Sequence, residues 1–166
     1  MPVTSQPITE QEVVDTMKNF QDAFEAGDPK FFDFFTKDMS MFTLTTPTRV
    51  DGLETYEHGF APFFLNKKRN SQILSPEVRL LGDKAAVMTF HNRILIQGVA
   101  TNLRGTVIFE RDDATGKLRC VHMHNSPLTQ PLATSAAAVS ENRSLEDITL
   151  LEERVASASA MAGTPK

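Results

Sequence analysis

The chain has 166 residues, 40% of them hydrophobic and 23% charged, with a formal net charge of −4. This length predicts one domain with a sizeable core. The mild acidity argues against a nucleic-acid or anionic-membrane surface, because such surfaces carry basic patches. The one basic cluster, residues 67–69, is interpreted as a solvated loop.

The cysteine count and the hydropathy pattern exclude further classes. Cys120 is the single cysteine, so neither a disulfide framework nor a thiolate zinc site is expected. No segment approaches the roughly 20 apolar residues that span a bilayer, and no signal segment opens the chain. We therefore expect a cytoplasmic protein that needs neither membrane nor nucleic acid.

Two helices are predicted first. Thr9 and Glu12 have the spacing of a capping box, apolar residues follow at helical spacing, and Gly27 ends the helix. Asp28 and Pro29 are typical of the start of a second helix. That helix carries four rings, too many to leave in water: Phe31, Phe32, Phe34 and Phe35.

A strand, a helix and another strand come next. Residues 39–46 predict a strand that Pro47 stops. A turn at residues 50–52 leads into a third helix, in which Pro62 predicts a kink or two short pieces. Residues 71–81 predict a strand at a sheet edge or with a bulge, because they contain Pro76.

Three long strands, residues 84–97, 101–111 and 117–126, form the centre of the prediction. They exceed the usual strand length of about five or six residues, which indicates a sheet that curls. The predicted fold class is α+β: a cone-shaped, curved antiparallel half-barrel around the N-terminal helices. Residues 1–128 make this domain, 129–143 a linker, and 144–166 an extra C-terminal helix and tail.

The element order and three sequence pieces carry a family resemblance. The pieces are VDGL at 50–53, LGDKAA at 81–86 and GKLRCVHMH at 116–124. They resemble the nuclear transport factor two-like superfamily, within it the SnoaL-like proteins and the association domain of calcium/calmodulin-dependent kinase. The resemblance implies a pocket at the open end of the cone and a homodimer through the outer face of the sheet. It implies no single function, since members include isomerases, dehydratases, cyclases and assembly modules.

The chain departs from this resemblance at two pocket positions. The kinase association domains carry arginines on two of the long strands, where this sequence has Asn92 and Val107. An anionic ligand held by two arginines is therefore in doubt.

Alternation along residues 84–97 predicts which side chains line the cone. Met88 and Phe90 are expected inside, and Phe60 of the third helix faces them. Asn92 falls on the same apolar face, so its amide needs a hydrogen-bond partner or a ligand. Arg104 is expected outside, unless a bulge near Gly105 turns it into the pocket.

Two further polar groups near the mouth are candidates. Tyr56 lies on the apolar stripe of the third helix, where its phenol can donate a hydrogen bond to an oxyanion. Asp51 is the one carboxylate considered for the pocket, against the alternative of a helix cap.

His122 and His124 are predicted to share one strand face with Leu118 and Cys120. A metal site of the His-x-His type needs a further Glu and His, which the sequence does not supply. Two readings stay open: one imidazole is a general base near neutral pH, or the pair packs at the end of the sheet.

Two functional hypotheses follow. In the first, the protein binds a small apolar or carbonyl-containing molecule and, if it is an enzyme, isomerises, dehydrates or cyclises it without a cofactor. Tyr56, Asn92 and a histidine would then converge in the cone. In the second, it is a non-catalytic homodimer or larger ring. A cone filled by its own phenylalanines favours the second hypothesis.

Overall fold

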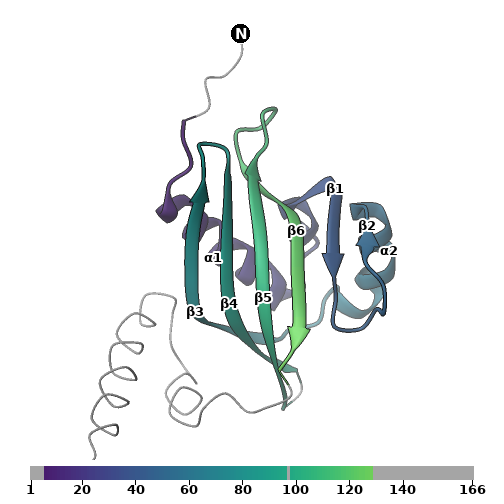
Figure 1. Cartoon of the computed structure of the whole chain (residues 1–166). Coiled ribbons are helices and arrows are strands. Elements are labelled where there is room, and N and C mark those ends of the chain that lie inside the picture. Colours follow the sequence, from purple (N-terminus) through teal and green to yellow (C-terminus); the bar gives the residue numbers. More distant parts are fainter. Residues whose placement is uncertain (1–5, 97, 129–166) are drawn as a thin grey trace, which may run out of the picture.

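The computed structural model describes residues 6–96 and 98–128 as one curved sheet with helices against one face (Figure 1). The predicted linker and the C-terminal helix lie outside the described residues. The helical elements are α1 (Glu10–Ala26), the 3₁₀ helix η1 (Pro29–Phe34) and α2 (Leu53–Phe64). The strands are β1 (Phe35–Phe42), β2 (Val50–Asp51), β3 (Asn70–Leu81), β4 (Ala85–Ile96), β5 (Val99–Arg111) and β6 (Leu118–Pro127).

The ends of α1 follow the predicted chemistry in part. The Thr9 hydroxyl accepts a hydrogen bond from the Glu12 amide at 3.2 Å, and Gly27 closes the helix in the left-handed conformation. Glu12 does not complete a capping box. Its carboxylate instead binds the Arg111 guanidinium through two bonds of 2.7 and 2.6 Å, which ties α1 to β5.

The phenylalanine-rich segment was predicted as a longer helix than the structure has. Asp28 caps it as expected, but the helix is 3₁₀ and ends at Phe34. Phe35 instead begins β1 and pairs with Cys120, and both side chains are completely buried. Sheet pairing therefore overrides the local pattern, and β1 begins and ends about four residues before the predicted strand.

The third predicted helix is a single helix, α2, with Pro62 inside it. Proline removes one amide donor, yet the last turn persists because the Leu65 amide donates to the Ala61 carbonyl at 3.0 Å. Of the two predicted alternatives, the division into two short pieces is wrong, and the kink at Pro62 stays a prediction.

The six strands have the order β2-β1-β6-β5-β4-β3. All pairs are antiparallel except β1 with β6, which is parallel, so the sheet is mixed rather than purely antiparallel. The sheet is curved and does not close into a barrel, and α1 runs behind β3 to β6 (Figure 1). The α+β half-barrel expected from the sequence is confirmed.

Two irregularities shift the register of strand pairing, and each changes which side chains face the interior. At the β3 edge the register shifts between Leu74 and Glu77, where Ser75 has a φ of 49° and Pro76 lies. This agrees with the edge or bulge predicted from Pro76. In β6, Ile108 pairs with His122 while Phe109 pairs with Cys120, so Val121 is an extra residue. Such a bulge increases the local twist and inverts the side-chain alternation beyond it.

Aromatic rings from the helices and from β1 pack together in the core. Phe31 is central, with ring centroids 4.7 Å from Phe64 and 4.8 Å from Phe20. Phe60 stacks on Tyr56 at 5.2 Å and on Phe64 at 5.0 Å. Contacts of this kind add to the free energy gained by burial, so the rings contribute to the hydrophobic core.

Candidate functional site

The inner face of β4 is where alternation predicted it. Met88 is fully buried, Phe90 is 5% exposed, and Phe60 lies partly buried against the same core. Phe90 covers Gly105 of β5, so closely that a Cβ at Gly105 would lie 2.4 Å from the ring. These residues face the interior as expected, and a role in binding a substrate remains a prediction.

Asn92 is the polar exception on this face. It pairs with Ile73 on one side and Leu103 on the other, two buried apolar residues. Its Oδ1 is buried and has no hydrogen-bond partner within the described part of the chain. A buried acceptor without a partner costs free energy, so this atom marks a place where a donor would be accommodated.

Tyr56 is buried in the aromatic cluster. Its ring lies 5.5 Å from Phe35 and 6.0 Å from Phe32. Burial raises the pKa of the phenol above its ordinary value, and the nearby Cys120 contributes in the same direction. The pKa of the buried Cys120 thiol is raised as well, because burial disfavours its thiolate.

The histidines do not face the cone. The bulge at Val121 turns His122 and His124 to the outer side of the sheet, where they pair with Ile108 and Thr106. The shared face with Leu118 and Cys120 was therefore predicted wrongly: those two are buried inside, as is Met123, the residue between the histidines. Convergence of a histidine with Tyr56 and Asn92 inside the cone is contradicted by this geometry.

On the outer side, the histidines form a small polar-aromatic cluster with β1. The Ser40 hydroxyl lies 2.7 Å from His122 Nδ1. The Phe42 ring, 40% exposed, has its centroid 5.9 Å from that of His122 and 5.1 Å from that of His124. No carboxylate is recorded against either imidazole among the described residues, so the pair lacks the orienting acid typical of a histidine base.

Arg104 and Asp51 also lie away from the cone. The pairing of β4 with β5 is continuous, so no bulge at Gly105 turns Arg104 inward, and its side chain is exposed. Asp51 is exposed on β2 and pairs with Arg49 at 2.7 Å. It does not cap α2, whose N-cap is Gly52.

Arg69 is buried, so the interpretation of residues 67–69 as a solvated loop is wrong at this residue. Its guanidinium lies 4.9 Å from the Phe24 ring centroid and 4.5 Å from that of Phe64, and it donates to the Phe64 carbonyl at 2.9 Å. Desolvation lowers its pKa, which the proximity of Tyr56 opposes. Arg69 alternates with the buried Ser71 and Ile73 into β3, and that alternation was the available signal.

The outer face of the sheet is the surface opposite α1 (Figure 1), and it presents a mixed row of outward side chains. It comprises Ser40, Phe42, Val87, Thr89, His91, Arg93, Arg104, Thr106, Ile108, His122 and His124. No described helix covers it.

Other kinds of site find less support among the described residues. No three His, Cys, Asp or Glu side chains in residues 6–96 and 98–128 come together as a metal site. No helix in those ranges is long and apolar enough to cross a membrane. A surface depression of about 670 Å³ lies along α2, lined by Glu54, Glu57, His58, Ala61, Pro62 and Leu65, and holds none of the predicted site residues.

The curved mixed sheet with helices on its inner face is that of a nuclear transport factor two-like α+β protein. The family model of the calcium/calmodulin dependent protein kinase II association domain matches residues 9–129. The chain belongs to this family. A search of curated protein sequences gives no significant match.

Solved structures of the same fold come from diverse proteins. The CaMKII hub homology domain of Chlamydomonas reinhardtii is 24% identical with a TM-score of 0.61, over 72% of this chain and 97% of that one. An NTF2-like protein of Pseudomonas putida is 17% identical with a TM-score of 0.63, over 81% and 96%. A proposed NTF2-like dehydratase of Streptomyces avermitilis is 17% identical with a TM-score of 0.63, over 72% and 96%. At these identities the likeness concerns the fold.

Proposed function

We propose that this protein is a homo-oligomeric assembly module that associates through the outer face of its sheet. The observation that carries the proposal is the placement of Phe42, Ile108 and the two histidines on a broad sheet face that no described element covers. Large exposed faces with apolar members are typical of interaction sites.

The placement of the histidines supports the same proposal. Acid-base catalysis in the cone needs a titratable base within hydrogen-bond reach of a substrate, and both histidines lie on the other side of the sheet. Tyr56 and Phe60 stack on each other, and Phe60 stacks on Phe64, so these rings contribute to the core. Membership of the association-domain family, whose relatives include a protein named as a hub, agrees with assembly.

The proposal is tested with two matched variants. Thr89 is exposed on β4 at the middle of the outer face, directly across from Thr106, whereas Thr55 is exposed on α2. Thr89→Lys should weaken self-association, because a twofold contact would bring the two new charges together, and Thr55→Lys should leave it unchanged. Sedimentation velocity over a concentration series measures both. Equal behaviour of the two variants would reject the outer face as the interface.

A second candidate function is the binding of a small molecule at Asn92. The observation that favours it is the buried, unpartnered Oδ1, which would accept a hydrogen bond from a hydroxyl or amide of an otherwise apolar ligand. This function is compatible with assembly, since Asn92 and the outer face lie on opposite sides of the sheet.

The second candidate predicts that the free protein is less stable with Asn92 than with an apolar residue at this position. Asn92→Leu should raise the free energy of unfolding by about 1–2 kcal/mol, because it removes an unsatisfied buried acceptor. Asn19→Leu, at an exposed position of α1, is the matched control and should change it by less than about 0.5 kcal/mol. Urea unfolding measures both. A loss of stability in Asn92→Leu would mean that the amide is satisfied in the free protein.

A further inference from the structure

Two of the four histidines in the chain lie side by side on the outer face. His122 and His124 belong to β6, an inner strand of the sheet between β1 and β5. His122 is half-buried and His124 is exposed. Histidine is the side chain whose charge ordinarily changes between about pH 5 and pH 8, so this part of the face gains positive charge in mild acid.

The side chains directly beside the two imidazoles carry no charge. Their partners in register on β5 and β1 are Ile108, Thr106, Ser40 and Phe42. In the described chain, an imidazolium at either position therefore has no counter-charge in direct contact. Water is then its main source of stabilisation, and removing that water is costly.

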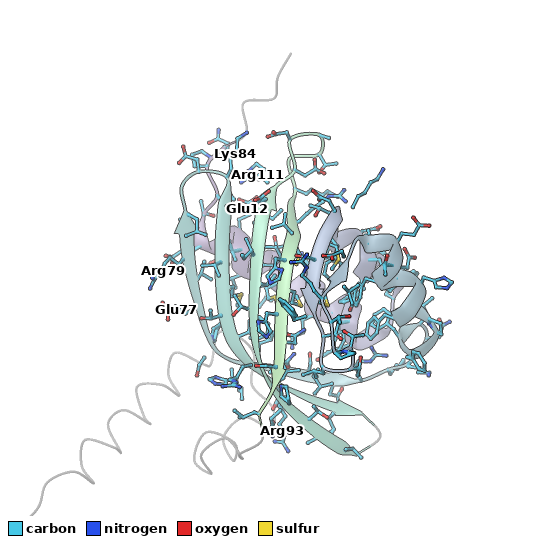
Figure 2. All side chains as sticks on the ribbon, turned by 45° about the vertical axis from the view of Figure 1, so that its right-hand side comes forward. Glu12, Glu77, Arg79, Lys84, Arg93 and Arg111 are labelled. Atoms are coloured by element: carbon cyan, nitrogen blue, oxygen red, sulfur yellow. The ribbon has the colours of Figure 1, made fainter. Side chains whose placement is uncertain are left out.

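Two carboxylates on the edge strands of the sheet are already paired with arginines. Asp51 of β2 lies opposite Ser40, and the Arg49 guanidinium donates to it at 2.7 and 3.3 Å. Glu77 of β3, which Figure 2 shows near the opposite edge, binds Arg79 at 3.1 Å. At least one strand separates each of these acids from β6.

The strands next to the histidines carry further charges. Glu110 of β5 lies opposite Arg119 of β6. On β1, the exposed Lys37 and Asp38 have opposite charges, and Arg104 of β5 is exposed and positive. Each acid on these two strands thus has a basic residue beside it, and Arg104 disfavours additional positive charge on the face.

The Ser40 hydroxyl holds His122 in place in both charge states. Its Oγ lies 2.7 Å from His122 Nδ1. A hydroxyl donates to an unprotonated ring nitrogen and accepts from a protonated one, so this hydrogen bond survives proton uptake. Proton uptake therefore changes the charge of the face without breaking this contact.

We propose that protonation of His122 and His124 dissociates the assembly formed through the outer face. This inference rests on the proposed function, because it requires that face to be buried between copies. Burial removes water from the imidazoles, and a twofold contact sets the same face of a second copy against them. Both effects disfavour the charged form, so the separated chain binds more protons than the assembled one. Association is then strongest above about pH 7 and weakens as the pH falls.

Sedimentation velocity of the full chain at two pH values tests the proposal. Free imidazoles are protonated below about pH 6.5, and each proton excluded from the contact raises Kd by about tenfold per pH unit in that range. Kd should therefore be about tenfold or more higher at about pH 5.5 than at about pH 7.5. The concentration series runs from nanomolar to micromolar, with fluorescence detection at its lower end.

The result also separates this inference from the proposed function. Association with the same Kd at both pH values would overturn the inference and leave the assembly intact. A monomer at both pH values and all concentrations would overturn both.

Matched glutamine variants assign the effect to the two histidines. His122→Gln combined with His124→Gln should give the same Kd at both pH values, because glutamine is polar but does not titrate. His58→Gln is the control: His58 is exposed on α2, so this variant should keep the pH dependence of the unmodified chain. A double variant that still dissociates in acid as the unmodified chain does would contradict the proposal.

A permanent charge replaces the change of pH in a second pair of variants. His124→Lys should raise Kd at about pH 7.5 by about tenfold or more, because the ammonium group stays charged there. His58→Lys should not change it. Circular dichroism checks that both variants keep the fold. Equal Kd values for a folded His124→Lys variant and the unmodified chain would overturn the proposal.

Discussion

At the scale of a single residue, the pKa of the Tyr56 phenol depends on its burial inside the cone. Burial raises the pKa of its phenol, so the folded state holds this proton more tightly than the unfolded state does. Stability is then complete below the ordinary tyrosine pKa of about 10 and falls as pH rises above it, by up to about 1.4 kcal/mol per pH unit.

The first prediction concerns this proton. Tyr56 is the only tyrosine and the chain has no tryptophan, so ultraviolet absorbance titrates Tyr56 alone. Tyrosinate should appear only together with alkaline unfolding, at a pH well above 10. Tyr56→Phe should stay folded and lose stability less steeply in that range. Tyrosinate forming near pH 10 in the folded protein would show that the phenol is in contact with solvent.

Asn92 and the histidines show what residue-level sequence patterns can predict. Asn92 was assigned to the interior correctly, because β4 pairs with β5 without interruption and strict alternation holds. His122 and His124 were assigned to the wrong side, because one extra residue at Val121 inverts the alternation of β6. Nothing in the local sequence marks that bulge, since it arises from pairing with strands on either side.

At the scale of elements, the ends of helices were the most predictable features. Thr9, Gly27 and Asp28 act locally through their own side chain or backbone, and all three have the expected role. The start of β1 was predicted four residues too late, because Phe35 pairs with Cys120, which is far away in the sequence. Arg69 was missed for the same reason, since its partners Phe24 and Phe64 come from two helices.

The second prediction concerns the contact between β4 and β5. A methyl group at Gly105 would overlap the buried Phe90 ring, so Gly105→Ala should lower the free energy of unfolding by about 1–3 kcal/mol. Gly59→Ala is the matched control: it lies in α2 with open space around it and should raise stability by about 0.5–1 kcal/mol. Chemical denaturation followed by circular dichroism measures both. Similar effects of the two substitutions would show that Phe90 does not cover Gly105.

At the scale of the whole molecule, the α+β class and the curvature followed from strand lengths and element order. The parallel pairing of β1 with β6 did not, because no local pattern distinguishes a parallel neighbour from an antiparallel one in a short strand. The same limit applies to function. The sequence indicated either a pocket or an assembly face, and it could not predict which side of the sheet His122 and His124 occupy, on which the choice between the two hypotheses depends.

The mass of the protein in solution tests the proposed assembly most directly. One chain has a mass of 18.4 kDa. Light scattering coupled to size exclusion, over micromolar concentrations, should give twice that mass or a higher multiple, because the proposed assembly would bury the apolar members of the outer face between copies. A constant mass of 18.4 kDa over the whole range would contradict the account.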